Sequence, residues 1–420
     1  MARQRQGSTA KLETFTIEAV GAQGDGVAAG PVHIPLTLPG ETVTALRQGQ
    51  RAELQDIVTA SPDRRDPPCR HFGVCGGCAL QHWEMNAYLA WKQDQVRRVL
   101  ARERLETEIA PIIATPAGSR RRLALHARAV KGGAAVGFKE RRSWALAPIS
   151  ECPIADPKLV AALPELAKLA RPFLEHPKSA PTLHVTLTET GLDIDVTGVE
   201  RKSGGLSADA RMRAAEAAQG ADFARVTLAG EIVYQARTPR VRVGPASVAL
   251  PPGSFLQAAA QAEVAMAELV LEGVKGAERL ADLFCGVGAF TFRLAGQGTV
   301  LAMDSAAEAI AALKGAISSA PGLKGITAEA RDLERRPLLA EDLKKIEAVV
   351  FDPPRAGAAE QARQIAKSAA PVAVAVSCNP ATFARDARLL VDGGFVLEKV
   401  TPVDQFLWSP HIELVAVFRR

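Results

Sequence analysis

From about residue 251 onward, strand-like hydrophobic segments alternate with alanine-rich helical stretches. The strand-like segments cover residues 280–284, 299–303, 348–351 and 372–377. This alternation is typical of a parallel sheet that is covered by helices on both faces. Two further strand patterns, at 396–400 and 412–418, follow each other without a helix between them. We therefore expect an antiparallel pair of strands at one edge of the sheet.

A chain of 420 residues is too long for one ordinary core, so we expect several domains. Residues 13–60 contain short alternating segments separated by glycine turns, which predicts a small barrel. Residues 61–250 mix a helical stretch at 87–104, a hairpin pattern at 122–138 and a polar segment at 201–205 that we expect to be an exposed loop. The predicted fold is multidomain α/β, with an OB-like barrel in residues 1–60, a mixed α+β central domain in 61–250 and a Rossmann-like sheet in 251–420.

The first strand of the predicted sheet leads into the segment Asp282-Leu-Phe-Cys-Gly-Val-Gly288. Its glycines allow a tight turn and a close approach of the backbone to a ligand. A dinucleotide-binding loop would have a third glycine at position 291, where this sequence has Thr291. Asp282, at the carboxyl end of the strand, suits a cationic ligand with an amino and a sulfonium group better than a pyrophosphate. The pattern therefore favours S-adenosylmethionine over a nicotinamide nucleotide.

Further candidate cofactor contacts follow the neighbouring strands. Asp304 ends the second strand, where a carboxylate can bind ribose hydroxyls. Asp332 comes after the next strand-like stretch and is placed to reach the adenine. Including one glutamine that is discussed below, the predicted cofactor-binding residues are Gln257, Asp282, Phe284, Gly286, Gly288, Asp304, Asp332 and Asp352.

Two polar motifs end later strands of the same sheet. Asp352-Pro-Pro-Arg355 follows the fourth strand, and Ser377-Cys-Asn-Pro380 follows the fifth. The carboxyl ends of parallel strands meet at one rim, where such sheets form their binding crevice. An antiparallel last strand begins at that same rim. We therefore expect Glu413 to join Asp352 and Cys378 there.

These three residues match the chemistry of methylating carbon 5 of a pyrimidine. That carbon becomes nucleophilic when a thiolate, here Cys378, adds to carbon 6. A base, here Glu413, then removes the proton from carbon 5 so that the thiolate can leave. Asp352 is positioned to hydrogen-bond the pyrimidine ring. The alternatives are a buried structural thiol for Cys378 and an exposed strand carboxylate for Glu413.

Three of the six cysteines lie in a glycine-rich segment, Cys69-x5-Cys75-x2-Cys78, and Cys152 is a possible fourth ligand. Four thiolates suit zinc or an iron–sulfur cluster. The spacing differs from the paired two-residue gaps of zinc ribbons, so we favour a [4Fe–4S] cluster; four unrelated cysteines are the alternative. A cluster here need not do redox work, and it would staple the central domain and shape an RNA surface.

The net charge of +5 is unevenly distributed, because residues 92–142 contain thirteen Lys or Arg and five acidic residues. A basic surface suits an RNA phosphate backbone, and an ordinary solvated face is the alternative. The sequence has no run of about 18 apolar residues that would span a membrane. No apolar stretch follows the basic start at Met1, so we expect no signal peptide. We expect a cytoplasmic, monomeric protein that binds RNA and no membrane.

Over nearly its whole length, the sequence resembles the bacterial uracil-5 RNA methyltransferases, specifically the iron–sulfur group that acts on 23S ribosomal RNA. Its most specific motifs are Cys69-Arg-His-Phe-Gly-Val-Cys-Gly-Gly-Cys78, Asp282-Leu-Phe-Cys-Gly-Val-Gly288, Asp352-Pro-Pro-Arg-Ala-Gly357 and Ser377-Cys-Asn-Pro-Ala-Thr-Phe-Ala-Arg-Asp386. The resemblance implies a TRAM-type barrel, Cys378 as the nucleophile and Glu413 as the proton-abstracting base. The family's tRNA-specific branch lacks the cluster cysteines, which favours 23S rRNA as the substrate.

The resemblance also covers Gly253-Ser-Phe-Leu-Gln257, and it places Phe255 and Gln257 near the cofactor and the target base. The predicted RNA contacts are Phe255, Arg120, Arg121, Arg122 and Arg355. The sequence departs from the family at Ala259, where Asn is usual. It also departs in Asp404-Gln-Phe-Leu-Trp-Ser409, where the family usually has Asp-Met-Phe-Pro-His-Thr. Trp408 in that segment would either stack on a displaced base or pack.

Other enzyme classes fit these motifs less well. Cytosine-5 RNA methyltransferases resemble proteins with a second cysteine beside Asp-Pro-Pro, and this sequence has none there. An amino-group methyltransferase would have an aromatic residue at the position of Arg355, and a radical methyltransferase would have a Cys-x3-Cys-x2-Cys motif. Two alternatives stay open: the same chemistry on a tRNA uridine, and a non-catalytic RNA-binding ribosome assembly factor.

Overall fold

The computed structural model describes residues 10–200 and 205–420, so most of the polar segment at 201–205 and the start of the chain lie outside the described residues. The chain divides into two compact units. Unit 1 comprises Met1–Gln95, Lys139–Ala147 and Phe406–Pro410, and unit 2 comprises Val96–Phe138, Pro148–Gln405 and His411–Arg420. Within the described residues, no helix combines the length and the apolar character that crossing a membrane requires.

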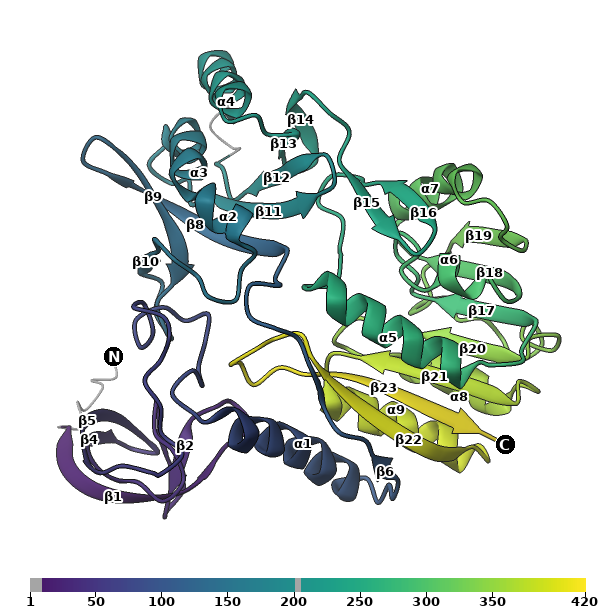
Figure 1. The fold of residues 1–420 in the computed structure, drawn as a ribbon, viewed down its shortest axis with the longest axis horizontal. Coiled ribbons are helices and arrows are strands. Elements are labelled where there is room, and N and C mark those ends of the chain that lie inside the picture. Colours follow the sequence, from purple (N-terminus) through teal and green to yellow (C-terminus); the bar gives the residue numbers. More distant parts are fainter. Residues whose placement is uncertain (1–9, 201–204) are drawn as a thin grey trace, which may run out of the picture. The chain divides into compact units, whose positions relative to one another are not determined.

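Unit 1 begins with a closed five-stranded barrel in the order β1-β2-β3-β5-β4 (Figure 1). Its strands alternate between buried and exposed side chains, and Ile17, Val32 and Val43 fill the interior. The barrel predicted from the glycine-separated segments is therefore confirmed. Its strands are β1 (Lys11–Val20), β2 (Gly26–Ala28), β3 (Val32–Ile34), β4 (Thr42–Gln48) and β5 (Arg51–Thr59).

A seven-stranded sheet forms most of the central part, in the order β10-β9-β8-β11-β12-β13-β14. The predicted hairpin at 122–138 is its β8–β9 pair, joined in antiparallel register. The sheet strands are β8 (Arg122–Val130), β9 (Gly133–Lys139), β10 (Leu146–Pro148), β11 (Thr182–Thr188), β12 (Gly191–Thr197), β13 (Arg225–Leu228) and β14 (Glu231–Gln235). The helices around this part of the chain are α1 (Met85–Arg102), which occupies the stretch predicted to be helical, α2 (Pro157–Ala161), α3 (Leu163–Ala170), η1 (Pro172–Leu174) and α4 (Ala208–Gly220).

The second large sheet has nine strands in the order β19-β18-β17-β20-β21-β23-β22-β6 with β7 beside β22. The pairs among β17, β18, β19, β20 and β21 are parallel, as the alternating sequence predicts. The strands are β6 (Glu108–Ile109), β7 (Ile113–Ala114), β17 (Arg279–Leu283), β18 (Thr299–Asp304), β19 (Ile326–Ala330), β20 (Ala348–Phe351), β21 (Val372–Ser377), β22 (Val396–Asp404) and β23 (Glu413–Arg419).

The last two strands form the expected antiparallel pair, but they are not the edge of the sheet. β23 lies between β21 and β22 and is antiparallel to both. β22 would then present unpaired backbone groups at the edge, and β6 and β7 cover them by pairing in parallel with it. The sequence around residues 108–114 gave no strand signal, because these strands are only two residues long.

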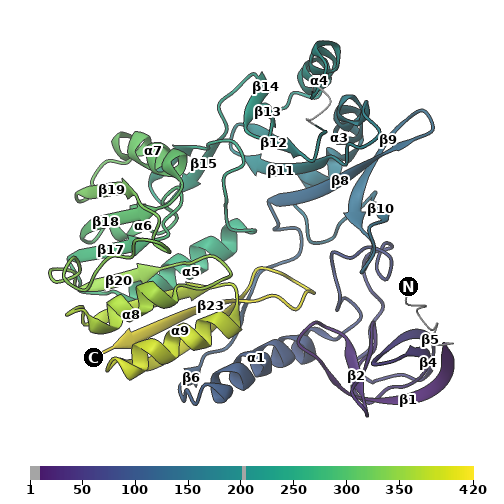
Figure 2. The same ribbon diagram turned by 180° about the vertical axis from the view of Figure 1, so that it is seen from behind.

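Helices cover both faces of this sheet, with α5 on one face and α8 and α9 on the other (Figures 1 and 2). The first face packs with α5, α6 and α7 in one core, and the second packs with α8, α9 and the end of α1 in another. The hairpin of β15 (Arg240–Val243) and β16 (Ala246–Ala249) buries its valines in the first core, although it precedes residue 251. The helices are α5 (Ala260–Gly273), α6 (Thr291–Leu294), α7 (Ala307–Ala316), η2 (Ile317–Ser319), α8 (Ala359–Lys367) and α9 (Pro380–Asp392).

Candidate active site

Three candidate catalytic residues meet at one rim of the nine-stranded sheet. Asp352 directly follows β20 and Cys378 directly follows β21, and these two strands are neighbours. Glu413 is the first residue of β23, whose next residue, Leu414, pairs with Ser377 at the end of β21. The antiparallel direction of β23 therefore brings the start of one strand beside the end of another, as the sequence predicts.

Glu413 is buried, with 3% of its surface exposed, and its Oε1 accepts a hydrogen bond from Gln405 Nε2 at 2.9 Å. The pKa of Glu413 is raised to about 8, mainly by burial and also by the negative charge of Asp352, while the Gln405 hydrogen bond and Arg355 oppose the shift. A carboxyl group that exchanges its proton near neutral pH is suited to general acid–base work.

The other two rim residues have similarly shifted ionisation. Burial raises the pKa of the Cys378 thiol, as do the charges of Glu413 and Asp352, whereas Arg355 lowers it through charge and a hydrogen bond. Burial raises the pKa of Asp352 to about 7. Its Oδ2 accepts a hydrogen bond from Gln257 Nε2 at 3.2 Å. Strongly shifted groups that gather in one place are typical of a functional site.

The segment that carries Arg355 is fastened to α9. Asn379 caps that helix by accepting from Ala381 N at 3.1 Å, and its amide donates to Arg355 O at 3.0 Å. The backbone of Ala358 donates to Asp386 Oδ2 at 2.6 Å. These bonds explain why both motifs extend beyond the rim residues: they keep the loop after β20 next to the start of α9.

The glycine loop after β17 leaves room for a ligand. Gly286 has φ 54°, and a Cβ placed there would meet nothing within 4 Å. Gly288 has φ 99°, and a Cβ there would approach the Phe292 ring to 2.7 Å. Phe284 also lies in this turn, with φ 63°. The backbone is therefore open to a ligand at Gly286, whereas Gly288 allows the loop to pack closely against Phe292.

Asp282 lies completely buried at the end of β17. Its Oδ2 accepts from the Thr291 hydroxyl at 2.5 Å, but its Oδ1 has no hydrogen-bond partner among the described residues. The pKa of Asp282 is raised to about 7, mainly by burial and also by the charges of Asp352 and Asp304, while the hydrogen bond from Thr291 opposes the shift. An orphaned buried carboxylate oxygen next to open backbone fits a cationic ligand such as S-adenosylmethionine, which would supply the missing partner.

The other two predicted cofactor acids have different surroundings. Asp304 accepts from Gly286 N at 2.9 Å and from Ala306 N at 2.8 Å, so it braces the glycine loop. Asp332 follows β19, and its Oδ1 accepts from the backbone N–H groups of Glu334 and Arg335 at 3.1 Å each. Asp332 thus stabilises its own turn, and its role toward adenine stays a prediction.

Two of the arginines predicted to contact RNA, Arg121 and Arg122, have partners within the chain. Arg121 is largely buried and pairs with Glu263 at 2.6 Å, and Arg122 donates to Leu256 O at 2.8 Å. Burial and the neighbouring charges of Arg121 and Arg120 lower the pKa of Arg122 to about 10. Arg122 also lies over the ring of Phe255, which is 73% exposed. Of the predicted RNA contacts, Phe255 and Arg355 are exposed to the solvent, and the RNA-contact role of all of them stays a prediction.

The cysteine loop belongs to unit 1, where Cys69 is buried and Cys75 and Cys78 are partly exposed. Burial raises the pKa of Cys75, and the nearby Cys69 adds to the effect. Cys152, the fourth predicted ligand, belongs to unit 2. Among residues 10–200 and 205–420, no three Cys, His, Asp or Glu side chains are arranged as a metal site. The loop thus offers suitable donors without a formed ligand set.

Trp408 was expected either to stack on a displaced base or to pack within the protein. It is 8% exposed, so its side chain packs. Its carbonyl accepts from Ala79 N at 2.8 Å and Leu80 N at 3.0 Å, directly after the last cysteine of the loop. Cys285, in the glycine loop, is also buried, with 4% of its surface exposed. Gln405 contacts the rim but was not predicted, since a lone polar residue in a loop gives no pattern.

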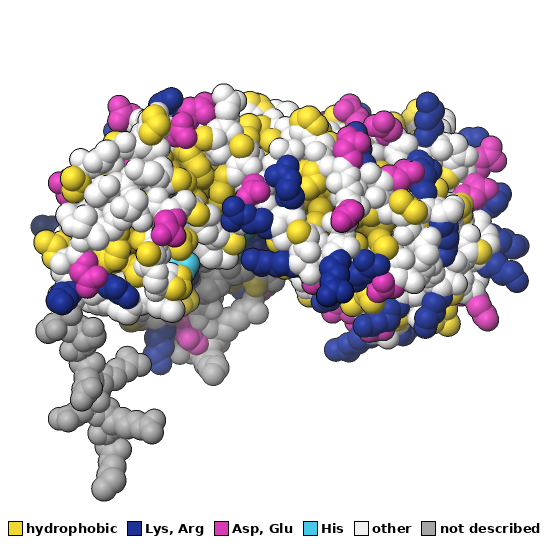
Figure 3. Space-filling view, turned by 90° about the horizontal axis from the view of Figure 1, so that it is seen from below, with side chains coloured by type: hydrophobic (Ala, Val, Ile, Leu, Met, Phe, Trp, Pro, Cys, Tyr) yellow, Lys and Arg dark blue, Asp and Glu magenta, His cyan; other side chains and the backbone are white. Residues whose placement is uncertain are grey.

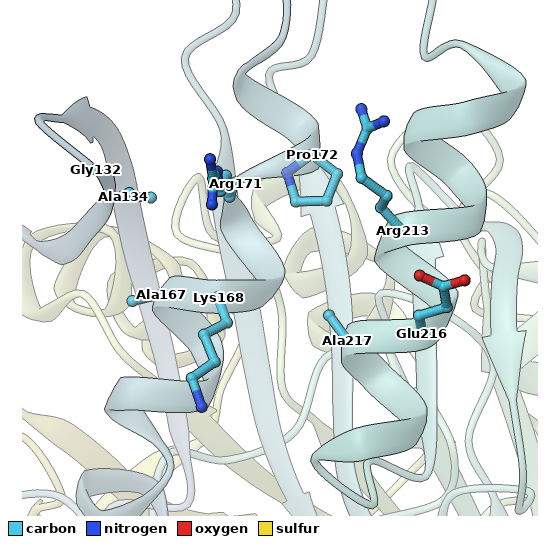
Figure 4. Close-up of a pocket in the computed structure, with 10 residues that line it drawn as sticks. Gly132, Ala134, Ala167, Lys168, Arg171, Pro172, Arg213, Glu216 and Ala217 are labelled. Carbon is cyan, nitrogen blue, oxygen red and sulfur yellow. The ribbon is translucent and has the colours of Figure 1, made fainter.

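A cavity of about 830 Å³ lies elsewhere, among the β8–β9 turn, α3 and α4 (Figure 4). Lys168, Arg171 and Arg213 give it a basic lining. Lys168 pairs with Glu165, and Arg213 pairs with Asp209. Basic and acidic side chains are also interspersed over the face drawn in Figure 3. None of the rim residues lines this cavity, so we do not assign it a part in catalysis.

The parallel sheet, the open glycine loop and the strand-end acids define an S-adenosylmethionine-dependent methyltransferase. The model of the family "tRNA (Uracil-5-)-methyltransferase" matches residues 245–420. An RNA methyltransferase of Caulobacter vibrioides is 65% identical over 97% of this chain and 100% of its own length. The 23S rRNA (uracil(1939)-C(5))-methyltransferase RlmD of Halomonas elongata is 33% identical over 97% of this chain and 89% of its own length. The chain belongs to the RNA uracil-5 methyltransferase family.

A solved structure agrees with this assignment. The Pyrococcus abyssi tRNA (uracil-54, C5)-methyltransferase, in complex with S-adenosyl-L-homocysteine, superimposes with a TM-score of 0.73. It is 25% identical in sequence, and the match covers 96% of this chain and 99% of that one. The similarity therefore extends over the barrel and the central part as well as the catalytic sheet.

Proposed function

We propose that this protein methylates carbon 5 of a uridine in 23S rRNA through a covalent bond between Cys378 and the base. The observation that carries the proposal is the meeting of Cys378, Glu413 and Asp352 at the ends of three neighbouring strands. A thiol, a buried carboxyl group of shifted pKa and a second carboxyl group are what this chemistry requires.

In this mechanism, the Cys378 thiolate forms a bond to carbon 6 of the uracil, and the electron pair of the double bond moves toward carbon 5 and the carbonyl at carbon 4. S-adenosylmethionine supplies the methyl group that becomes bonded to carbon 5. Glu413 then takes the proton from carbon 5, the double bond re-forms, and the thiolate leaves carbon 6. Asp352 hydrogen-bonds the ring, and Gln257 holds Asp352 at 3.2 Å.

The cofactor would lie along the glycine loop. Asp282 would give its unpaired oxygen to the cationic end, and Asp304 keeps Gly286 in place through the 2.9 Å hydrogen bond. Phe255, exposed beside Arg122, would stack on the target base once that base leaves its helix.

The similarity to the 23S rRNA methyltransferase RlmD of Halomonas elongata supports the ribosomal substrate, because the match spans almost the whole chain. The Pyrococcus abyssi enzyme is a tRNA methyltransferase, so a tRNA uridine is the second candidate substrate. Nucleoside mass spectrometry of 23S rRNA and tRNA from cells with and without the gene decides between them. Loss of one 5-methyluridine from 23S rRNA is the expected result. Loss of 5-methyluridine from tRNA would overturn the assignment of 23S rRNA as the substrate. No loss from either RNA would favour the assembly-factor alternative.

We also propose that Cys69, Cys75, Cys78 and Cys152 bind a [4Fe–4S] cluster, and that the barrel is a TRAM-type RNA-binding domain. Four thiols are suitable donors, and the loop already hydrogen-bonds a sulfur, since Gly77 N lies 3.4 Å from Cys75 Sγ. The mechanism above uses no step at the cluster. Purification without oxygen, followed by iron and sulfide analysis, tests for the cluster. Zinc bound to the four thiols would contradict the proposal.

We further propose that the protein works as a monomer in the cytoplasm.

A further inference from the structure

Gln405 is the first residue after β22, at the start of the segment that leads to β23, and it is 4% exposed. Its Nε2 donates to Glu413 Oε1 at 2.9 Å and to Gln257 Oε1 at 2.7 Å. Its Oε1 accepts from the backbone N–H of Ala258 at 2.8 Å. Every polar atom of the amide is therefore used. An amide buried this deeply would be costly if its partners were removed.

Through Gln257, the same amide connects the two carboxyl groups of the rim. Gln257 uses its Nε2 for Asp352 and its Oε1 for Gln405. Because one end of each amide only donates and the other only accepts, this order of bonds fixes the orientation of both side chains. Glu413 thus receives a directed donor that holds one of its oxygens and leaves the other for the substrate.

We propose that Gln405 is a positioning residue that keeps the Glu413 carboxylate aligned for proton abstraction. The inference rests on the proposed function, in which Glu413 is the base. The family pattern described above usually has Met at this position and Asn at position 259, where this chain has Ala259. The role proposed for Gln405 therefore does not come from the family resemblance. It rests on the hydrogen bonds that Gln405 makes in this structure.

The charged and titratable groups around Glu413 set the direction of the expected pH effect. Asp352 and burial favour the protonated form of Glu413, while Arg355 and the Gln405 donor favour the carboxylate. Cys378 is the other titratable group nearby. Removing the Gln405 donor raises the pKa of Glu413 further, so that less carboxylate is present at a given pH.

The test is single-turnover methylation of an RNA substrate by the full-length protein and its Gln405→Met variant, between about pH 6.5 and 9.5. Methionine keeps the length of the side chain and removes its hydrogen bonds. We expect the rate at neutral pH to fall about tenfold or more and the acidic limb of the pH profile to move upward. We also expect a methylated covalent protein–RNA complex to accumulate, because proton removal has become slow.

Gln361→Met is the matched control. Gln361 is also a buried glutamine, and its amide bonds Leu338 N at 2.9 Å and Leu338 O at 3.1 Å, away from the rim. This variant should lose thermal stability without an altered pH profile or a trapped complex. The proposal is overturned if Gln405→Met behaves in the same way. If the unaltered protein forms no 5-methyluridine at all, the proposed function has failed instead.

A second, independent observation concerns Trp144 in unit 1, whose ring is 88% exposed. Lys139 Nζ lies 3.9 Å from the centre of that ring. The segment around them is well anchored: Gly76 N donates to Lys139 O at 2.9 Å and Arg141 N to Val74 O at 3.2 Å. Arg141 and Arg142 both pair with Asp25 of the barrel. A large aromatic ring is thus held in the solvent by a rigid, basic support.

We infer that Trp144 and Lys139 form a stacking site for an unpaired base of the RNA substrate. An exposed aromatic ring beside positive charge is the combination that binds single-stranded RNA. A protonated lysine on one face of the ring leaves the other face for a base. The inference depends on RNA being the substrate and is independent of the covalent chemistry.

Tryptophan fluorescence tests this site directly, because Trp83, Trp91 and Trp408 are each at most 8% exposed. Titration with a single-stranded fragment of 23S rRNA, without cofactor, should quench the exposed emission. Trp144→Ala should weaken RNA binding about tenfold, and Trp144→Phe should retain most of it. Ile232→Ala, at a 57% exposed residue of β14, is the matched control. Unchanged RNA affinity in Trp144→Ala, or unquenched emission on binding, would overturn the inference.

Discussion

The catalytic rim and the cysteine loop both carry thiols that their sequence motifs single out. At the rim, Cys378 follows a strand that is buried along its whole length, and paired strands bring Asp352 and Glu413 beside it. In the loop, Cys69, Cys75 and Cys78 lie among turns, and the described part of the chain contains no formed metal-ligand group. Backbone pairing and core packing arrange the first site without a ligand. Metal ligands, by contrast, commonly take their final arrangement only when the metal binds.

The largest effect that this comparison predicts is that of Cys378→Ala. Without the thiolate, carbon 5 of the uracil is not activated, so methyl transfer should fall at least about 10³-fold. The fold should remain, because Cys378 is partly exposed and stands outside β21. Single-turnover formation of 5-methyluridine, together with thermal unfolding, measures both. A rate above a tenth of the original would exclude Cys378 as the nucleophile.

Glu413→Gln should slow the release of the methylated RNA rather than the addition of Cys378 to the uracil. The amide cannot accept the proton from carbon 5, so turnover should fall about 10²-fold or more. The methylated RNA should remain bound to the protein through Cys378. Denaturing gels with RNA labelled by the cofactor's methyl group would show this complex. Its absence, with a low rate, would assign the base to another residue.

The pH dependence of the reaction tests whether the raised pKa values of the rim residues control the rate. Glu413 must be a carboxylate to act as a base, and its pKa is raised to about 8. The carboxylate fraction therefore increases about fivefold between pH 7 and pH 8. The Cys378 thiolate changes in the same direction, since its pKa is raised as well. Single-turnover rates should rise over this interval, and a flat or falling profile would contradict the assignment.

Changing the cysteine loop should have the smallest effect on methylation. Cys75→Ser should remove iron and sulfide from the purified protein and lower its thermal midpoint, while methylation falls by less than about tenfold. The reason is that no rim residue lies within the loop and the mechanism has no step there. Metal analysis and rate measurements on one preparation make the comparison. A loss as large as that of Cys378→Ala would mean that the loop takes part in the chemistry.

The sequence was most informative where a side chain lies at the end of a strand with a clear hydrophobic pattern. Asp282, Asp352 and Cys378 lie at strand ends, and the order of strands in a parallel sheet brings such ends together. Glu413 could be placed because an antiparallel strand starts at the same rim. The barrel followed from turn residues at short intervals.

Contacts that depend on tertiary position could not be predicted from the sequence. Gln405 and Arg121 are ordinary polar residues in sequence, and only folding brings Gln405 to Glu413 and Arg121 to Glu263. The strands at residues 108–114 are too short to leave a periodic pattern. The basic stretch suggested open RNA contacts, but charge along a sequence does not tell which arginines acquire internal partners.

The position of β23 between β21 and β22 has a consequence for how the enzyme matures. Both neighbours precede β23 in the chain, and β22 also pairs with residues 108 and 109, almost 300 positions earlier. Pairings over such separations form slowly, and synthesis produces Cys378 before Glu413. Until β23 has paired with β21, Cys378 does not have Glu413 beside it. The rim on which the proposed function rests therefore depends on the pairing of β23 with both of its neighbours.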